Sequence, residues 1–154
     1  MNKESSYQIR IIGHREHFHA IRRLVHFVTL QQGVDEMEAD VIERAVAEAC
    51  QNGLYHEPAD EENPTIEVEI SLKDEMITTV VKNRGKAFNF DDIEPFNVRQ
   101  NFLEYKNGGL GIPIMKAVMD EVSYERRSGN LNVVTLVKYL NTKAERREGE
   151  HYED

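Results

Sequence analysis

The sequence predicts an α+β fold: a two-layer sandwich whose mixed, mostly antiparallel sheet carries helices on one face. Strand-like segments come in adjacent pairs joined by short turns, and helical segments are grouped between them. Such paired strands disfavour an all-parallel doubly wound sheet. The 154 residues suffice for one domain with a substantial core. We therefore expect a single domain over residues 1–140 and a charged, disordered tail over 141–154.

Helices are predicted where apolar residues recur three and four apart. The first is expected over 16–31, where Gly33 stops it. The second runs over 35–54 and must end before Pro58. A short third helix is expected over 112–119.

Strands are predicted from alternating or continuous apolar runs. They are expected over 8–12, 65–72, 76–81, 122–126 and 131–139. Asp74-Glu75 and Ser128-Gly129-Asn130 supply the turns of two hairpins. The stretch 84–109 has no sustained period, which is typical of a lid, a binding loop or a disordered segment.

Composition limits the class of partner. Acidic residues number 28 against 19 basic ones, a formal net charge of −9, which disfavours nucleic acid as the main partner. No apolar stretch approaches the length of a membrane helix or a secretion signal. The single cysteine, Cys50, fits a reducing compartment and a buried helix position. We expect a cytoplasmic protein.

The first candidate motif lies on the second predicted helix. Glu48, Asn52 and His56 are four residues apart and so share one face. A carboxylate can deprotonate an attacking hydroxyl, and an amide oxygen one turn on can ligate a hard cation. A solvated face of an amphipathic helix is the alternative that this helix alone leaves open.

The second motif is Asn107-Gly108-Gly109-Leu110-Gly111, which leads into a helix with Pro113 in its first turn. Glycines let backbone N–H groups approach an anion, and the helix dipole adds positive potential there. This pattern predicts a phosphate cradle, with a flexible hinge as the alternative.

The third motif is Val80 to Gly85, where a predicted strand gives way to glycine. The Asn83 amide could recognise a purine edge by hydrogen bonding, although an ordinary turn is the preferred interpretation of this motif in isolation.

The histidines near the N-terminus do not predict a metal site. Their spacing is only partly helical, and no nearby cysteine or carboxylate completes a ligand set. We interpret them as surface or core residues; they are His14, His17, His19 and His26.

Together the three motifs resemble the GHKL (Bergerat-fold) ATPase superfamily, and more closely the RsbW-like anti-sigma-factor serine/threonine kinases. The resemblance spans about Ile9 to Tyr139. It rests on Glu48, Asn52 and His56, and on Gly108 to Gly111 followed by Met119-Asp120-Glu121-Val122.

The resemblance implies an ATP-dependent protein kinase with ATP and Mg²⁺ as cofactors. Glu48 would be the general base and Asn52 would hold Mg²⁺, while Lys106 or Arg99 would neutralise phosphate charge. The nucleotide-binding residues that it implies are Asn52, His56, Asn83, Gly85, Lys106, Gly108, Gly109, Leu110 and Gly111.

The partners that the resemblance implies are a STAS-domain anti-anti-sigma protein, phosphorylated on serine or threonine, and a sequestered sigma factor. It also implies a homodimer. Two alternatives stay open: a non-catalytic, nucleotide-dependent binding module, and the catalytic fragment of a histidine kinase acting in trans.

This sequence departs from the family pattern at the residues that would recognise the nucleotide's purine base. The family has an aspartate followed by two spaced glycines where this chain has Asn83, Gly85 and Ala87. A neutral amide accepts a hydrogen bond that is weaker by about 1 kcal/mol. Its NH₂ can instead donate, which would relax base selectivity, and Ala87 would stiffen the turn.

Overall fold

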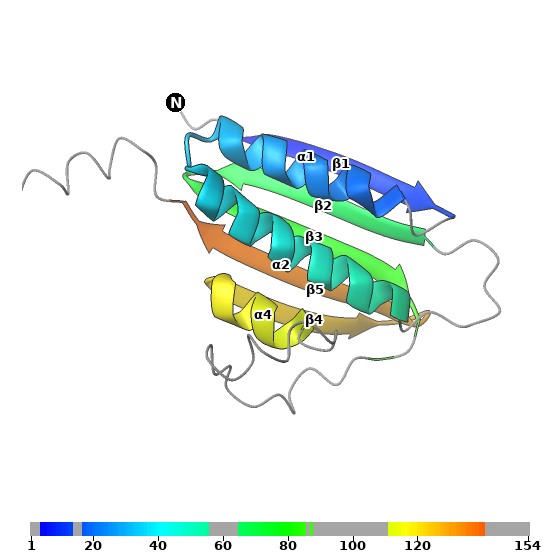
Figure 1. Cartoon of the computed structure of the whole chain (residues 1–154). Helices are drawn as coiled ribbons and strands as arrows, with labels where there is room; N and C mark the ends of the chain where they lie inside the picture. The colour runs from blue at the N-terminus through cyan, green and yellow to red at the C-terminus, as the bar shows by residue number, and fades with distance from the viewer. Residues whose placement is uncertain (1–3, 14–16, 56–64, 86, 88–110, 141–154) are drawn as a thin grey trace, which may run out of the picture.

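A computed structural model describes residues 4–13, 17–55, 65–85, 87 and 111–140, with backbone alone at 52–55 and 111–114. Five strands form one sheet in the order β1-β2-β3-β5-β4, and each neighbouring pair is antiparallel (Figure 1). The strands are β1 (Ser5–Ile12), β2 (Thr65–Lys73), β3 (Met76–Arg84), β4 (Glu121–Arg127) and β5 (Leu131–Tyr139).

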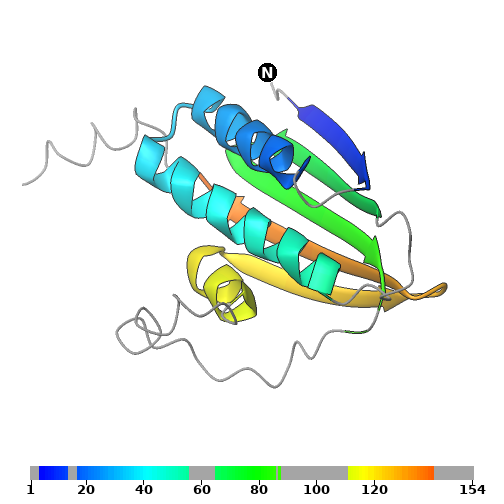
Figure 2. The same ribbon diagram turned by 45° about the vertical axis from the view of Figure 1, so that its right-hand side comes forward.

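The described helices all cover one face of this sheet (Figure 2). They are α1 (Phe18–Gln31), α2 (Glu36–Tyr55) and α4 (Gly111–Val118). Helix α2 lies between the other two and contacts both, and it also packs on β3 and β5. The α+β sandwich with helices on one face is therefore confirmed. None of the described helices is long and apolar enough to cross a membrane.

The alternation of β2 decides which face of the sheet is covered. Ile66, Val68, Ile70 and Leu72 are buried, whereas the residues between them are exposed or half-buried. Burying each such side chain contributes about 1.5–3 kcal/mol. The α2 residues in the same buried cluster include small ones, which let the helix approach the sheet closely: Ala39, Ala45, Ala49 and Cys50.

Local signals begin and end these elements. Gly33 has φ 85°, which a glycine tolerates, and it follows α1. The N–H of Glu38 donates to Oδ1 of Asp35 over 2.8 Å, so Asp35 caps the start of α2. Asp74 and Glu75 have φ of 51° and 59°, the left-handed pair that a two-residue hairpin requires.

Strand β3 is longer than its sequence pattern predicts. Pairing with β5 continues through Asn83 opposite Asn132 and Arg84 opposite Leu131. Because the ladder supplies backbone hydrogen bonds to the end of the strand, Asn83 lies within β3 and is not part of a turn. The other helices and strands lie within a few residues of their predicted bounds. The tail over 141–154 and most of 84–109 lie outside the described residues.

Candidate nucleotide site

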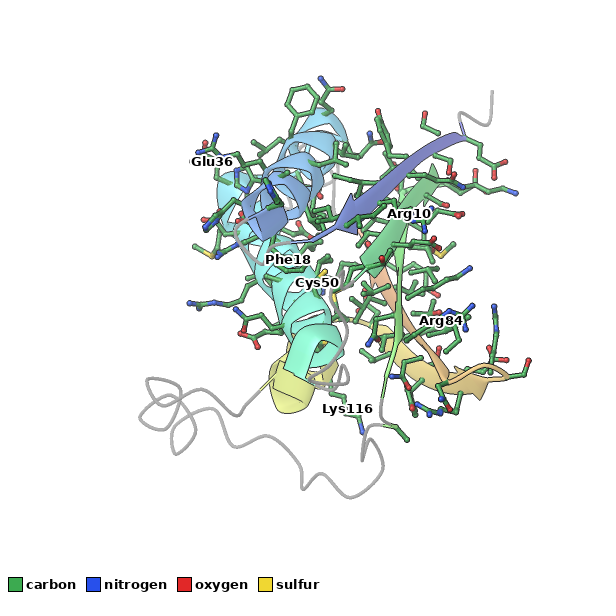
Figure 3. The ribbon with its side chains drawn as sticks, turned by 90° about the vertical axis from the view of Figure 1, so that its right-hand side faces the viewer. Arg10, Phe18, Glu36, Cys50, Arg84 and Lys116 are labelled. Carbon is green, nitrogen blue, oxygen red and sulfur yellow. The ribbon has the colours of Figure 1, made fainter. Side chains whose placement is uncertain are left out.

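Helix α2 connects the candidate residues to the rest of the fold. It packs against α4 on one side and against β3 and β5 beneath. Cys50 lies between the helix and the sheet (Figure 3), only 2% exposed, and burial raises the pKa of its thiol to about 12. The thiol is therefore protonated at neutral pH and serves as core packing, as its sequence context predicts.

Glu48 is half-buried on the same helix. Burial raises the pKa of its carboxyl above the ordinary value of 4.5, and the positive charges of Arg44 and Arg22 partly offset this. A carboxylate held in this way binds a proton more tightly than a solvated one. A carboxylate with a raised pKa is a group that can act as a general base.

Asn52 follows Glu48 by four residues, and both belong to α2. One helical turn separates them, so the backbone places them on the same face. The side chain of Asn52 is not described, and His56 lies outside the described residues, just after the end of α2 at Tyr55.

Asn83 lies beneath the helix layer, opposite a second asparagine. It is 3% exposed, and its partner in the ladder, Asn132 on β5, is fully buried. The hydroxyl of Tyr124 donates to Oδ1 of Asn132 over 2.6 Å, and Nη1 of Arg126 donates to the same oxygen over 2.9 Å. Two donors therefore fix the amide orientation of Asn132.

The backbone at Gly85 is held on both sides. Its N–H donates to the carbonyl of Asn130 over 3.0 Å, and its carbonyl accepts from Nη1 of Arg126 over 2.6 Å. Nη2 of Arg126 also donates to Oδ1 of Asn130 over 3.1 Å. One guanidinium therefore links the end of β3 to the β4–β5 hairpin.

These supporting residues are absent from the sequence-based set. Asn132 and Arg126 occupy positions that face the helix layer, where the neighbouring position Val134 is apolar and buried. Asn132 falls on the same alternating strand positions as the buried residue Val134, and a polar residue at such a position indicates a buried polar role. The contact of Arg126 with Gly85 depends on strand order, which local patterns do not give.

The glycine motif is described only at its last residue. Gly111 begins α4, so Pro113 falls in the first turn as predicted. Gly108, Gly109 and Leu110 lie outside the described residues, and so do Lys106 and Arg99.

The fold and these motifs define an ATPase domain, and the chain belongs to the family of histidine kinase-like ATPase domains, whose model matches residues 13–138. Its relatives include the serine-protein kinases RsbW of Bacillus subtilis (strain 168) and of Staphylococcus aureus (strain MRSA252). The first is 26% identical, covering 91% of this chain and 89% of the relative; the second is 25% identical, covering 99% and 98%.

A solved structure shares the fold. It is described as the crystal structure of the SiaB–SiaC complex from Pseudomonas aeruginosa, with a TM-score of 0.57 and 11% identity. The match covers 87% of this chain and 89% of that one. Family membership implies ATP binding by this domain.

Replacing Arg126 with glutamine should destabilise the domain. The substitution removes the donors to Gly85 and Asn132, and we expect the free energy of unfolding to fall by about 1 kcal/mol in urea denaturation. The control is Arg127→Gln, whose guanidinium forms a solvent-exposed ion pair with Glu125; this variant should show no measurable change. Equal effects of the two variants would contradict a structural role for Arg126.

Proposed function

We propose that this protein binds ATP with Mg²⁺ and transfers the γ-phosphate to a serine or threonine hydroxyl of a STAS-type anti-anti-sigma protein. In the same proposal it sequesters a sigma factor. Family membership together with Glu48 and Asn52 on one face of α2 carries this proposal. The relatives that are named serine-protein kinases support the choice of phosphate acceptor.

The proposed reaction is the transfer of the γ-phosphate from ATP to a hydroxyl group. The partner's hydroxyl oxygen attacks the γ-phosphorus, the bond to the β–γ bridging oxygen breaks, and ADP leaves. Glu48 accepts the hydroxyl proton. Its raised pKa suits it to this role, because proton transfer is most efficient when the base is matched to the working pH.

Oxygen donors suit the cation. Mg²⁺ takes oxygen ligands and is held by few protein groups plus phosphate oxygens. The amide oxygen of Asn52, one turn from the Glu48 carboxylate, fits that preference. Mg²⁺ would neutralise phosphate charge, while the N–H groups of the 108–111 segment and Lys106 would hold the phosphates.

We assign the purine to the end of β3. Asn83 is buried there, and Gly85 is fixed by Arg126 and Asn130. A fixed backbone lowers the cost of ordering the pocket on binding. His56, which follows α2, completes the proposed nucleotide contacts.

Partner proteins and self-association are also part of the proposal. The structural neighbour is described as a complex of two proteins, and the relatives act on protein serine. We propose a homodimer in a single nucleotide-binding domain over 1–140, located in the cytoplasm.

A non-catalytic module is the second candidate. The observation that favours it is the buried pair of neutral amides, Asn83 and Asn132, at the proposed base site. In that case nucleotide would order the partner-binding surface with no phosphate transfer.

Glu48→Gln separates the two candidates. The variant keeps the size of the side chain and one acceptor oxygen but cannot accept the proton, so phosphate transfer should fall by about 10²-fold or more. ATP affinity should stay within a few-fold, and Glu36→Gln, an exposed change on the same helix, should behave as wild type. We would follow transfer with γ-labelled ATP and the cognate partner. Transfer at the wild-type rate by Glu48→Gln would exclude Glu48 as the base.

The pH dependence of transfer should report the environment of Glu48. Only the ionised carboxylate accepts a proton, and burial raises its pKa, so the acid limb of the rate profile should lie above pH 4.5. Arg44 lowers this pKa, so Arg44→Gln should move the acid limb to higher pH. Arg23→Gln, on the exposed face of α1, is the matched control and should leave the limb in place. A limb that is unmoved, or moved to lower pH, in Arg44→Gln would show that Glu48 is not the titrating group.

A further inference from the structure

Away from the candidate nucleotide site, α1 and α2 bring three metal-ligating side chains together. Nδ1 of His26 lies 3.0 Å from Oε2 of Glu43 and 3.3 Å from Oδ1 of Asp40. The ligand atoms of the three residues all lie within 4.8 Å of one another. No described residue outside this trio joins a comparable cluster of histidine, cysteine and carboxylate groups.

The helix pairing explains the arrangement. Asp40 and Glu43 are three residues apart on α2, so their side chains project from one face. His26 belongs to α1, which packs directly against α2. The sequence of α1 alone does not reveal the carboxylates beside His26, because Asp40 and Glu43 both belong to α2. The expectation that no carboxylate completes a ligand set with the histidines is therefore wrong for His26.

The ring nitrogen Nδ1 of His26 lacks a well-aligned hydrogen-bond partner among the described residues. Nδ1 is covered from solvent, and within the described residues it makes no hydrogen bond of acceptable geometry, although two carboxylates lie at ion-pair distance. A covered polar atom without an aligned hydrogen-bond partner calls for an explanation. A cation bound between the three donor atoms would supply the missing partner.

The separations fit a coordinated cation. Zinc bonds to nitrogen and oxygen of about 2.0–2.1 Å place neighbouring ligand atoms roughly 3.0 Å apart in octahedral and roughly 3.3 Å apart in tetrahedral geometry. The two distances from Nδ1, 3.0 and 3.3 Å, have these values. The two carboxylate oxygens lie within 4.8 Å of one another.

A neighbouring side chain orients one ligand. Nε of Arg22 donates to Oε1 of Glu43 over 3.1 Å, which leaves Oε2 directed to His26. Hydrogen bonds of this kind commonly fix metal-ligating carboxylates. The Asp40 side chain is 68% exposed, so water can reach the open side of the cluster and complete the coordination.

We propose that His26, Asp40 and Glu43 form a binding site for a divalent transition-metal ion of the Zn²⁺ class. One imidazole nitrogen with two carboxylate oxygens suits zinc, cobalt or nickel better than Mg²⁺ or Ca²⁺, which prefer oxygen ligands alone. The bound ion would join α1 to α2. The argument for this site does not rest on nucleotide binding or on the kinase proposal, although Arg22, which donates to Glu43, also lowers the pKa of Glu48.

The test uses the full chain, stripped with a chelator and free of nucleotide, and titrates Zn²⁺ by calorimetry. We expect one site that is at least about tenfold weaker in His26→Ala and in Asp40→Asn. His19→Ala, an exposed histidine on the same helix, is the matched control and should retain the site. Co²⁺ should give visible bands without sulfur charge transfer, which excludes Cys50 as a ligand.

Thermal unfolding shows whether a variant that fails to bind Zn²⁺ is still folded. Asp40 is largely exposed, so Asp40→Asn should fold normally. Zn²⁺ should raise the Tm of the wild type and of His19→Ala but not that of Asp40→Asn, because a ligand stabilises only a protein that binds it. Absence of binding to the wild type, or equal binding by wild type and His26→Ala, would overturn the proposal and leave an ion-pair cluster between the helices.

Discussion

The packing of α2 on β3 and β5 is the contact on which the other features depend. Small side chains on the helix, Ala45 and Ala49 among them, are fully or almost fully buried against the sheet and allow a close approach. The same helix carries Glu48 and Asn52 and contacts α4, which begins at Gly111. A shift of α2 would therefore displace the core and the candidate catalytic residues together.

The end of β3 is held by a different kind of contact. Polar contacts support its last residues: Arg126 joins Gly85 to Asn130, and Tyr124 helps to fix Asn132. Buried polar groups that are all hydrogen-bonded favour a single arrangement, because breaking one bond leaves a buried donor or acceptor unpaired, which costs free energy. We infer that this network keeps the strand end preorganised for a ligand.

Much of the fold follows from local patterns, because helix and strand periods are properties of short segments. The alternation of 65–72 predicts β2, and the spacing of Glu48 and Asn52 places them on one helical face without knowledge of the topology. Contacts between distant segments are different. The pairing of Asn83 with Asn132, and of His26 with Glu43, depends on strand order and helix packing.

The sequence patterns also misplace the start of β1, which begins at Ser5, and the end of β3, and the second error has a clear physical reason. The β3 strand extends to Arg84 because β5 offers partners as far as Leu131, and no local signal within 76–81 reveals that length. The roles proposed for His56, Lys106 and the 108–110 segment stay predictions, since these residues lie outside the described ranges.

Calorimetry with ATP, ADP and GTP, with and without Mg²⁺, tests the central claim most directly. The wild type and Asn52→Ala should be compared, with Gln51→Ala as an exposed neighbour on the same helix. We predict saturable, Mg²⁺-dependent ATP binding that weakens in Asn52→Ala and not in Gln51→Ala. Absence of nucleotide binding by the wild type, or equal binding by all three proteins, would contradict the assignment of the nucleotide site to α2 and the end of β3.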